Sequence, residues 1–138
     1  MSGLLEILLP YTGYLALLLR VVVGATLMIH GYPKLKSPDQ GANWMKSMGM
    51  PGSTALLAGI LEFFGGLFLV VGLIVPVIAL FFAIQFLSIV LMKKIKMKAE
   101  YVSTSKPSYE IDVTYLLLSL VVVVLGSGVL AIDKLIGF

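Results

Sequence analysis

Two ionisable residues, Arg20 and Glu62, lie inside stretches of apolar residues, and the amide Gln85 lies inside a third stretch. A charged side chain at the centre of a bilayer costs at least ~2.5–3.5 kcal/mol, so such residues usually face the protein interior, pair with one another or serve a function. All three lie near the middle of their stretches, and a guanidinium, a carboxylate and an amide can satisfy one another there. We therefore predict an intramembrane cluster in which Arg20 pairs with Glu62 and Gln85 is a second partner.

Two interpretations of this cluster are open. It could only fix the register of the helices, as buried polar groups sometimes do. It could instead line a cavity for a polar headgroup such as that of a quinone, or lie on a proton path. Small residues share the helix faces of both charged residues and let a neighbouring helix come close, namely Gly13, Gly24 and Gly31 with Arg20, and Ala55, Ala58 and Gly66 with Glu62.

Further candidates lie near the ends of the apolar stretches. His30, Lys34 and Trp44 are candidates for contacts with a quinone or a lipid headgroup. Glu110 and Asp133 flank the last stretch as helix-end acids, which we expect to be solvated or paired with lysines. The chain has one histidine and no cysteine, and metal sites normally need several ligands, so we expect neither a metal site nor a thiolate-bound cluster within it.

Hydrophobic residues make up 59% of the 138 residues, against about 45–50% in ordinary soluble domains, which indicates an integral membrane protein. A helix needs about 20 apolar residues to span the hydrocarbon core. The predicted fold is an all-α bundle of four transmembrane helices that forms a single domain over residues 1–138. The predicted spans are 11–31, 54–75, 77–92 and 113–132.

The connections between the spans carry their own signals. Ser37-Pro38-Asp39 is typical of a helix start, and Gly49 and Pro51 of a stop, so we predict a short helix over about 38–48 that lies in the membrane interface. The alternative is a loop helix that packs on the bundle. The second and third spans have almost no linker, which predicts a tight antiparallel hairpin with Pro76 at the start of a helix.

The basic residues predict the orientation, because lysine and arginine accumulate in short cytoplasmic loops. Eight lysines lie in the first and third connections, at positions 34, 36, 46, 93, 94, 96, 98 and 106. We expect a multi-pass protein of the cell membrane with these loops in the cytoplasm and both termini outside. The net charge of +3 suits anionic lipid headgroups better than nucleic acid.

The order and spacing of these residues resemble the DoxX family. The resemblance rests on Arg20-x3-Gly24-x5-His30-Gly31-x2-Lys34, Glu62-x2-Gly65-Gly66-x5-Gly72-Leu73, Glu110 and Gly126-Ser127-Gly128-x4-Asp133. It implies a small four-helix membrane protein with quinone-linked redox work, and it does not specify a reaction. The sequence departs from the commoner family ending, since Ser127 replaces a proline and Ala131-Ile132 replaces serine-leucine, so details of the last helix should differ.

Three functions follow as hypotheses. The first is a non-catalytic accessory subunit of a quinone-linked respiratory oxidoreductase or terminal quinol oxidase. The alternatives are a thiosulfate:quinone oxidoreductase subunit that takes part directly in catalysis, and a small proton-coupled transporter. We expect no cofactor bound by this chain alone apart from quinone or quinol. The expected partners are the lipid membrane and either other membrane redox subunits or further copies of the chain.

Overall fold

A computed structural model describes residues 2–138, and this part of the chain forms helices and no strands. The elements are α1 (Ser2–Leu8), the 3-10 helix η1 (Leu9–Tyr11), α2 (Thr12–Lys36), α3 (Pro38–Ser47), α4 (Ser53–Val71), α5 (Val75–Ile95), α6 (Glu110–Leu125) and α7 (Ile132–Ile136). Of the described residues, three helical stretches are long and apolar enough to cross a membrane: Gly3–Lys36, Ser53–Val71 and Val75–Ile95. The all-α membrane class is therefore confirmed. A fourth span stays a prediction, because α6 has only 16 residues.

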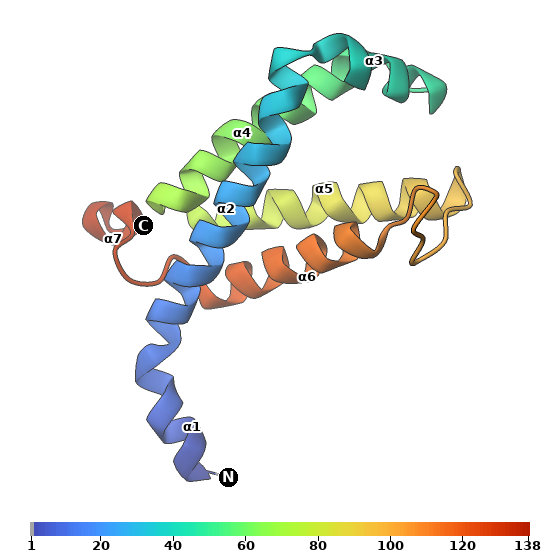
Figure 1. Cartoon of the computed structure of the whole chain (residues 1–138). Coiled ribbons are helices and arrows are strands. Elements are labelled where there is room, and N and C mark those ends of the chain that lie inside the picture. Colours follow the sequence, from blue (N-terminus) through green and yellow to red (C-terminus); the bar gives the residue numbers. More distant parts are fainter. Residues whose placement is uncertain (1) are drawn as a thin grey trace.

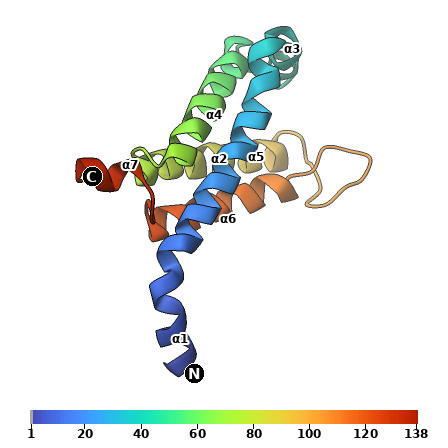
Figure 2. The same ribbon diagram turned by 60° about the vertical axis from the view of Figure 1, so that its left-hand side comes forward.

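The long helices are arranged as two pairs (Figures 1 and 2). Helix α2 packs along α4, and α5 packs along α6. The predicted tight hairpin of α4 and α5 is wrong, because the two helices diverge from their short turn and each packs mainly on another partner (Figure 1). Helices α1 and η1 continue α2 away from the crossing of the pairs (Figures 1 and 2).

Glycines form the contact between α2 and α4. A Cβ atom on Gly66 would lie 2.5 Å from the carbonyl oxygen of Gly24, and a Cβ on Gly24 would lie 2.5 Å from that of Gly66. Seven residues further along α2, a Cβ on Gly31 would lie 2.8 Å from the carbonyl oxygen of Gly59. Only glycine permits backbones to approach this closely. The predicted small-residue faces therefore meet, and these pairs set the register between the helices.

The hydrophobic core lies where the two helix pairs cross. Its buried members come from α2, α4, α5 and α6, namely Val23, Leu27, Leu69, Val75, Ala79, Phe82, Phe86 and Val122. Van der Waals packing among these side chains joins the pairs to each other at this level. Away from the crossing the two pairs separate, which leaves room for a cavity between them (Figure 1).

The turn between α4 and α5 ends one helix and starts the next within a few residues. Gly72 has φ +78°, its amide donates to the carbonyl of Leu69 at 3.2 Å, and the amide of Leu73 donates to the carbonyl of Phe68 at 2.9 Å, which is the Schellman arrangement. Ile74 follows with φ 45°, and Pro76 lies in the first turn of α5 as predicted. The left-handed backbone at both ends of this turn directs α5 away from α4.

The predicted span 113–132 is wrong in its last third. Helix α6 ends at Leu125, because Gly126 adopts φ +71° and the chain then turns back toward α2. The amide of Val129 donates to the carbonyl of Gly13 at 3.1 Å in this returning segment. The short helix α7 follows. Residues 126–131 thus form a connection that lies across α2 instead of continuing a helix.

Asp133 is fully buried, so the expectation of a solvated or lysine-paired acid is wrong for this residue. Its carboxylate accepts hydrogen bonds from the amides of Ile74 and Val75, the second at 2.9 Å, and from the hydroxyl of Ser127. A carboxylate at a helix N-terminus satisfies unpaired amides and complements the helix dipole. Asp133 therefore caps α5 from a distant part of the chain, whereas Glu110 begins α6 as expected.

Replacing Asp133 with asparagine is expected to lower the free energy of unfolding by about 1–2 kcal/mol, because the amide removes the charge and one of the two acceptor oxygens at the start of α5. Thermal unfolding in one detergent, followed by circular dichroism, measures the loss. Asp39→Asn is the matched control, since Asp39 is exposed in the first turn of α3. Equal stability of the two variants would contradict the capping role.

Candidate functional site

The structure places Arg20 and Glu62 apart, so the predicted pair between them is wrong. Arg20 bonds to Leu69 of α4, and Glu62 lies seven residues earlier in that helix, about 10 Å along its axis. The prediction assumed that both residues lie at mid-depth of their spans. The contact between Gly24 and Gly66 sets the register of α2 against α4, and this register places Arg20 level with the end of α4.

Arg20 is bonded to backbone carbonyls. Its Nη1 donates to the carbonyls of Leu69 at 2.8 Å and Val70 at 2.6 Å, and its Nη2 donates to those of Leu130 at 2.8 Å and Val129 at 3.3 Å. The side chain is 1% exposed. A cation at the C-terminal end of α4 complements the helix dipole and satisfies carbonyls that have no partner within the helix. Arg20 therefore joins α2, the end of α4 and the returning segment.

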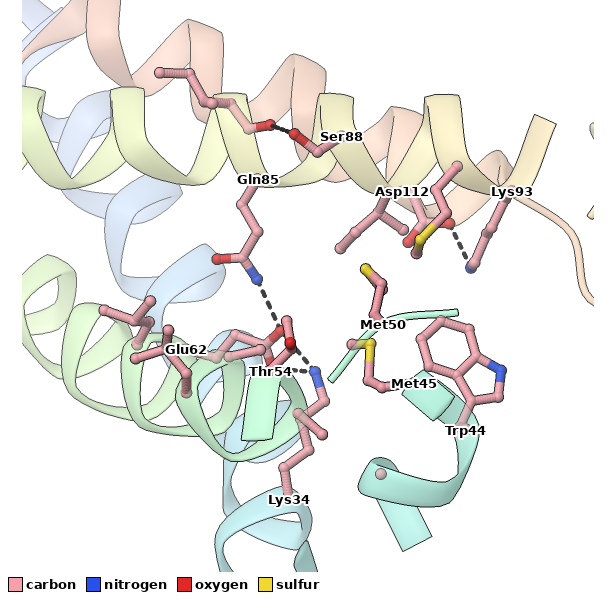
Figure 3. A pocket seen from close by; sticks show the side chains of 18 of the residues that line it. Lys34, Trp44, Met45, Met50, Thr54, Glu62, Gln85, Ser88, Lys93 and Asp112 are labelled. Carbon is pink, nitrogen blue, oxygen red and sulfur yellow. Dashed lines mark hydrogen bonds and ion pairs between the residues drawn. The ribbon is translucent and has the colours of Figure 1, made fainter. Parts of the chain in front are cut away.

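Glu62 is 3% exposed and pairs with Lys34. The Lys34 Nζ lies 2.6 Å from both carboxylate oxygens, and the Gln85 Nε2 donates to Oε1 at 3.0 Å (Figure 3). The structure thus brings Gln85 to Glu62, as predicted, and Lys34 takes the position expected for Arg20. Three helices contribute to this polar cluster, which consists of Lys34 from α2, Glu62 from α4 and Gln85 from α5.

A signal for Lys34 is present in the sequence. Residues three or four apart are neighbours on a helix surface, and Lys34 follows Gly31 by three residues. Gly31 lies against α4, where an added Cβ would be 3.1 Å from the Cβ of Glu62. The long side chain of Lys34 therefore reaches Glu62 from the same face of α2. Treating position 31 as the end of the span placed Lys34 in a loop and hid this pairing.

The polar cluster lies at one side of a cavity of about 530 Å³ between the two helix pairs. Other walls come from α3, the following turn, α4 and α5, and they include Trp44, Met45, Met50 and Phe81. Figure 3 shows Trp44, Met45 and Met50 across the cavity from Glu62 and Gln85. A mostly apolar cavity with few convergent polar groups is typical of a small-molecule site. It suits a ligand with an apolar body and a polar edge.

A second ion pair lies at another part of the cavity wall. Lys93 near the end of α5 lies 2.6 Å from Asp112 in the first turn of α6, and its Nζ also donates to the carbonyl of Ser108 at 3.1 Å. Lys96 donates to the carbonyl of Met48 at 3.5 Å, which connects the end of α5 with the chain after α3. The contacts of Lys93 hold the end of α5 to the start of α6 at the cavity wall.

The three predicted headgroup residues do not converge. Lys34 and Trp44 line the cavity, whereas His30 is not among its lining residues. His30 is exposed on α2, and its ring makes an edge contact with Tyr115 of α6 at 6.1 Å between centroids. The short helix that carries Trp44 is present at Pro38–Ser47 and packs against α2 and α4. Its position in a membrane interface stays a prediction.

The side chains of the cavity can hold a proton or a hydrogen-bonding ligand. Within residues 2–138, no group of three or more histidine, cysteine, aspartate or glutamate side chains could hold a metal ion. The polar cluster supplies a carboxylate, an ammonium and an amide, which are groups that bind polar ligand atoms and exchange protons. Ligand recognition and proton exchange are therefore the chemistry that this arrangement supports.

Comparisons with known proteins agree with this picture of a membrane protein. The sequence model of a family described as DoxX matches residues 15–94, a region that includes Arg20, Lys34, Glu62 and Gln85. A protein named "Putative oxidoreductase CatD" from Bacillus subtilis (strain 168) is 28% identical over 120 residues, which cover 87% of this chain and 85% of that protein. No solved structure matches the chain.

Proposed function

Because the chain belongs to the DoxX family, we propose that it is an integral membrane accessory subunit of a quinone-linked respiratory oxidoreductase or terminal quinol oxidase, and that its cavity holds the quinone. The observation that carries the proposal is the cavity of about 530 Å³ with apolar walls and the Lys34–Glu62–Gln85 cluster at one side. The name of the Bacillus relative adds support for redox work.

The residues present fit a quinone. Its flat ring and apolar tail suit walls that carry Trp44, Phe81 and methionines, and its polar oxygens suit the side formed by Lys34 and Gln85. The Lys34 ammonium has three N–H groups, and two contacts go to Glu62, so one N–H is free for a ligand oxygen. A bound quinone would supply the redox couple that the side chains of this chain lack.

The side chains have distinct roles in this proposal. Glu62 orients both Lys34 and Gln85 through its two oxygens, and its carboxylate can take up or release a proton. The apolar walls exclude water and hold the ring. A chain with one histidine and no cysteine offers few groups for electron transfer, so we assign the electron donor or acceptor to a partner subunit.

The accessory role is tested by gentle solubilisation of native membranes followed by purification of this chain. We expect a redox subunit to co-purify, detectable by mass spectrometry and by haem or flavin absorbance, together with extractable quinone. Purification in mild detergent without a redox partner and without quinone would overturn the accessory role.

Replacing Glu62 with leucine is expected to weaken quinone binding about tenfold, because the variant releases Lys34 and Gln85 from their bound orientations, and a charged hydrogen bond contributes about 1.5–3 kcal/mol. Trp44 is the single tryptophan and lines the cavity, so quenching of its fluorescence by a short-chain naphthoquinone reports binding in lipid nanodiscs. Glu6→Leu, on the exposed face of α1, is the matched control. Unchanged quenching in the Glu62 variant would contradict the assignment of the site.

One observation favours proton-coupled transport as a second candidate function. Arg20 was predicted to pair with Glu62, and the structure separates the two residues. Glu62 lies instead beside Lys34 at a cavity wall, where a carboxylate could exchange protons with a passing solute. Proton uptake into proteoliposomes without any redox partner would favour transport over the accessory role.

Full turnover of a purified redox complex that carries Glu62→Gln would argue against direct catalysis by this residue.

A further inference from the structure

Contacts between helices close three sides of the cavity. At its deep end, the Gln85 amide of α5 bonds to Glu62 of α4. On the side between α2 and α6, the ring of His30 contacts that of Tyr115 at 6.1 Å between centroids. Helix α3 covers a third side, where Figure 3 shows Trp44 facing the polar cluster across the cavity. The remaining side lies between α4 and α5.

On that remaining side, the wall formed by α5 reaches the outer surface of the molecule. Successive residues of a helix lie about 100° apart around its axis. Gln85 lines the cavity, and Phe86, on one side of it, is 6% exposed and belongs to the core. Ile84, on the other side of Gln85, also lines the cavity and is 58% exposed. The cavity therefore opens to the outside at Ile84.

The wall formed by α4 has the same property. Leu57 lines the cavity and is 56% exposed. The two helices touch near their turn, where a Cβ on Gly65 would lie 2.7 Å from the ring of Phe82, and they diverge away from that contact (Figure 1). Leu57 and Ile84 therefore lie at the edges of an opening between α4 and α5, which we call the mouth.

The mouth faces lipid. Both α4 and α5 are long and apolar enough to cross a membrane. Ile84 lies near the middle of α5, which runs from Val75 to Ile95. A side chain at the middle of a membrane-spanning helix meets acyl chains and not water, because the hydrocarbon core is about 30 Å thick. A molecule dissolved in the bilayer can thus reach the mouth directly.

The polar cluster inside the cavity offers one accessible member. The side chain of Lys34 is 35% exposed, whereas that of Glu62 is 4% exposed. Lys34 lines the cavity, and its ammonium keeps an N–H beyond the two contacts with Glu62. The cavity thus combines a polar end at Lys34, apolar walls and an apolar opening to the bilayer.

We propose that the ligand of this cavity is a long-tailed molecule of the bilayer that enters through the mouth, with its polar end at Lys34 and its hydrocarbon tail between α4 and α5. The inference rests on the proposed function, because it names the class of quinone that the site takes and the route by which it enters. A tail in the mouth packs against Leu57 and Ile84 and remains in the lipid phase. Binding then does not require the tail to leave the bilayer.

Photolabelling of the protein in lipid nanodiscs tests the position of the tail. The probe is a naphthoquinone with a long alkyl chain that carries a diazirine at its free end, and mass spectrometry locates the labelled residues after digestion. We expect label at Leu57 and Ile84. An excess of about a hundredfold of the same molecule without the diazirine should remove most of this label by mass action. Label at Ile29, which is exposed on α2 and does not line the cavity, should persist because it reports contact with bulk lipid.

A pair of variants on α5 tests whether the mouth admits the tail. Ile84→Phe places a larger side chain at the edge of the mouth, so the label at Leu57 that the competitor removes should fall severalfold. Leu87→Phe is the matched control, since Leu87 is exposed on the same helix and does not line the cavity, and it should leave this label unchanged. Equal labelling in the two variants would overturn the role of Ile84.

The outcomes separate this inference from the proposed function. Label that the competitor removes at Trp44 and Met45, and not at Leu57 and Ile84, would show that the tail passes α3, which would overturn the mouth and leave the quinone site standing. Quenching of Trp44 fluorescence by a short-chain naphthoquinone, without any label that the competitor removes, would do the same. Absence of both the quenching and such label would overturn the proposed quinone site and this inference with it.

Discussion

Replacing Arg20 with methionine is expected to lower the free energy of unfolding by about 3–5 kcal/mol, the range for removing one member of a buried charged network. The guanidinium is 1% exposed and donates to four carbonyls, two at the end of α4 and two in the returning segment. Methionine fills much of the same volume and donates to none of them. The four carbonyls would then be buried without this donor, and the end of α4 would lose its cation.

Thermal unfolding and the fraction of monodisperse protein on size-exclusion chromatography, both in one detergent, measure this effect. Arg20→Lys should recover only part of the stability that Arg20→Met loses. The lysine ammonium keeps the positive charge, but it lacks the planar guanidinium whose N–H groups reach two chain segments at once. If Arg20→Met unfolds within about 1 kcal/mol of the unaltered protein, the surrounding carbonyls do not depend on Arg20.

The second large effect is expected from Gly66→Ala, which should lower the free energy of unfolding by about 3 kcal/mol. The added Cβ would lie 2.5 Å from the carbonyl oxygen of Gly24 and 3.0 Å from the amide nitrogen of Met28. Both are backbone atoms, so the clash cannot be relieved by a side-chain rotation. Helices α2 and α4 must separate, which also moves Lys34 relative to Glu62 and should weaken ligand binding.

Gly3→Ala is the matched control for this prediction, because a Cβ on Gly3 has nothing within 4 Å. Alanine favours a helix over glycine by about 0.5–1 kcal/mol, so the control should be neutral or slightly stabilised. The double variant Gly24→Ala, Gly66→Ala should cost less than the sum of the two single changes, since both disrupt one contact. Additive losses would show that the two glycines do not act through this shared contact.

Several features were predictable from local sequence patterns. The apolar composition predicted an all-α membrane protein, Pro38 and Pro76 predicted helix starts that the structure contains, and helix periodicity predicted that Arg20 and Glu62 face other helices. Each of these depends on residues close together in the sequence or on the 3.6-residue period. The pairing of Gln85 with Glu62 was also predictable, because both are polar groups that must find partners within apolar helices.

Periodicity places a residue on a face of a helix and says little about its level along a neighbouring helix. That level depends on the glycine contacts between α2 and α4, which bring Lys34 to Glu62 and Arg20 to the end of α4. The turn at Gly126 likewise redirects the chain so that Asp133 reaches the start of α5. The sequence by itself determined the membrane class, the helices and their polar faces. The partners of the charged residues were decided only by tertiary packing, because backbone contact between distant segments sets the register of one helix against another.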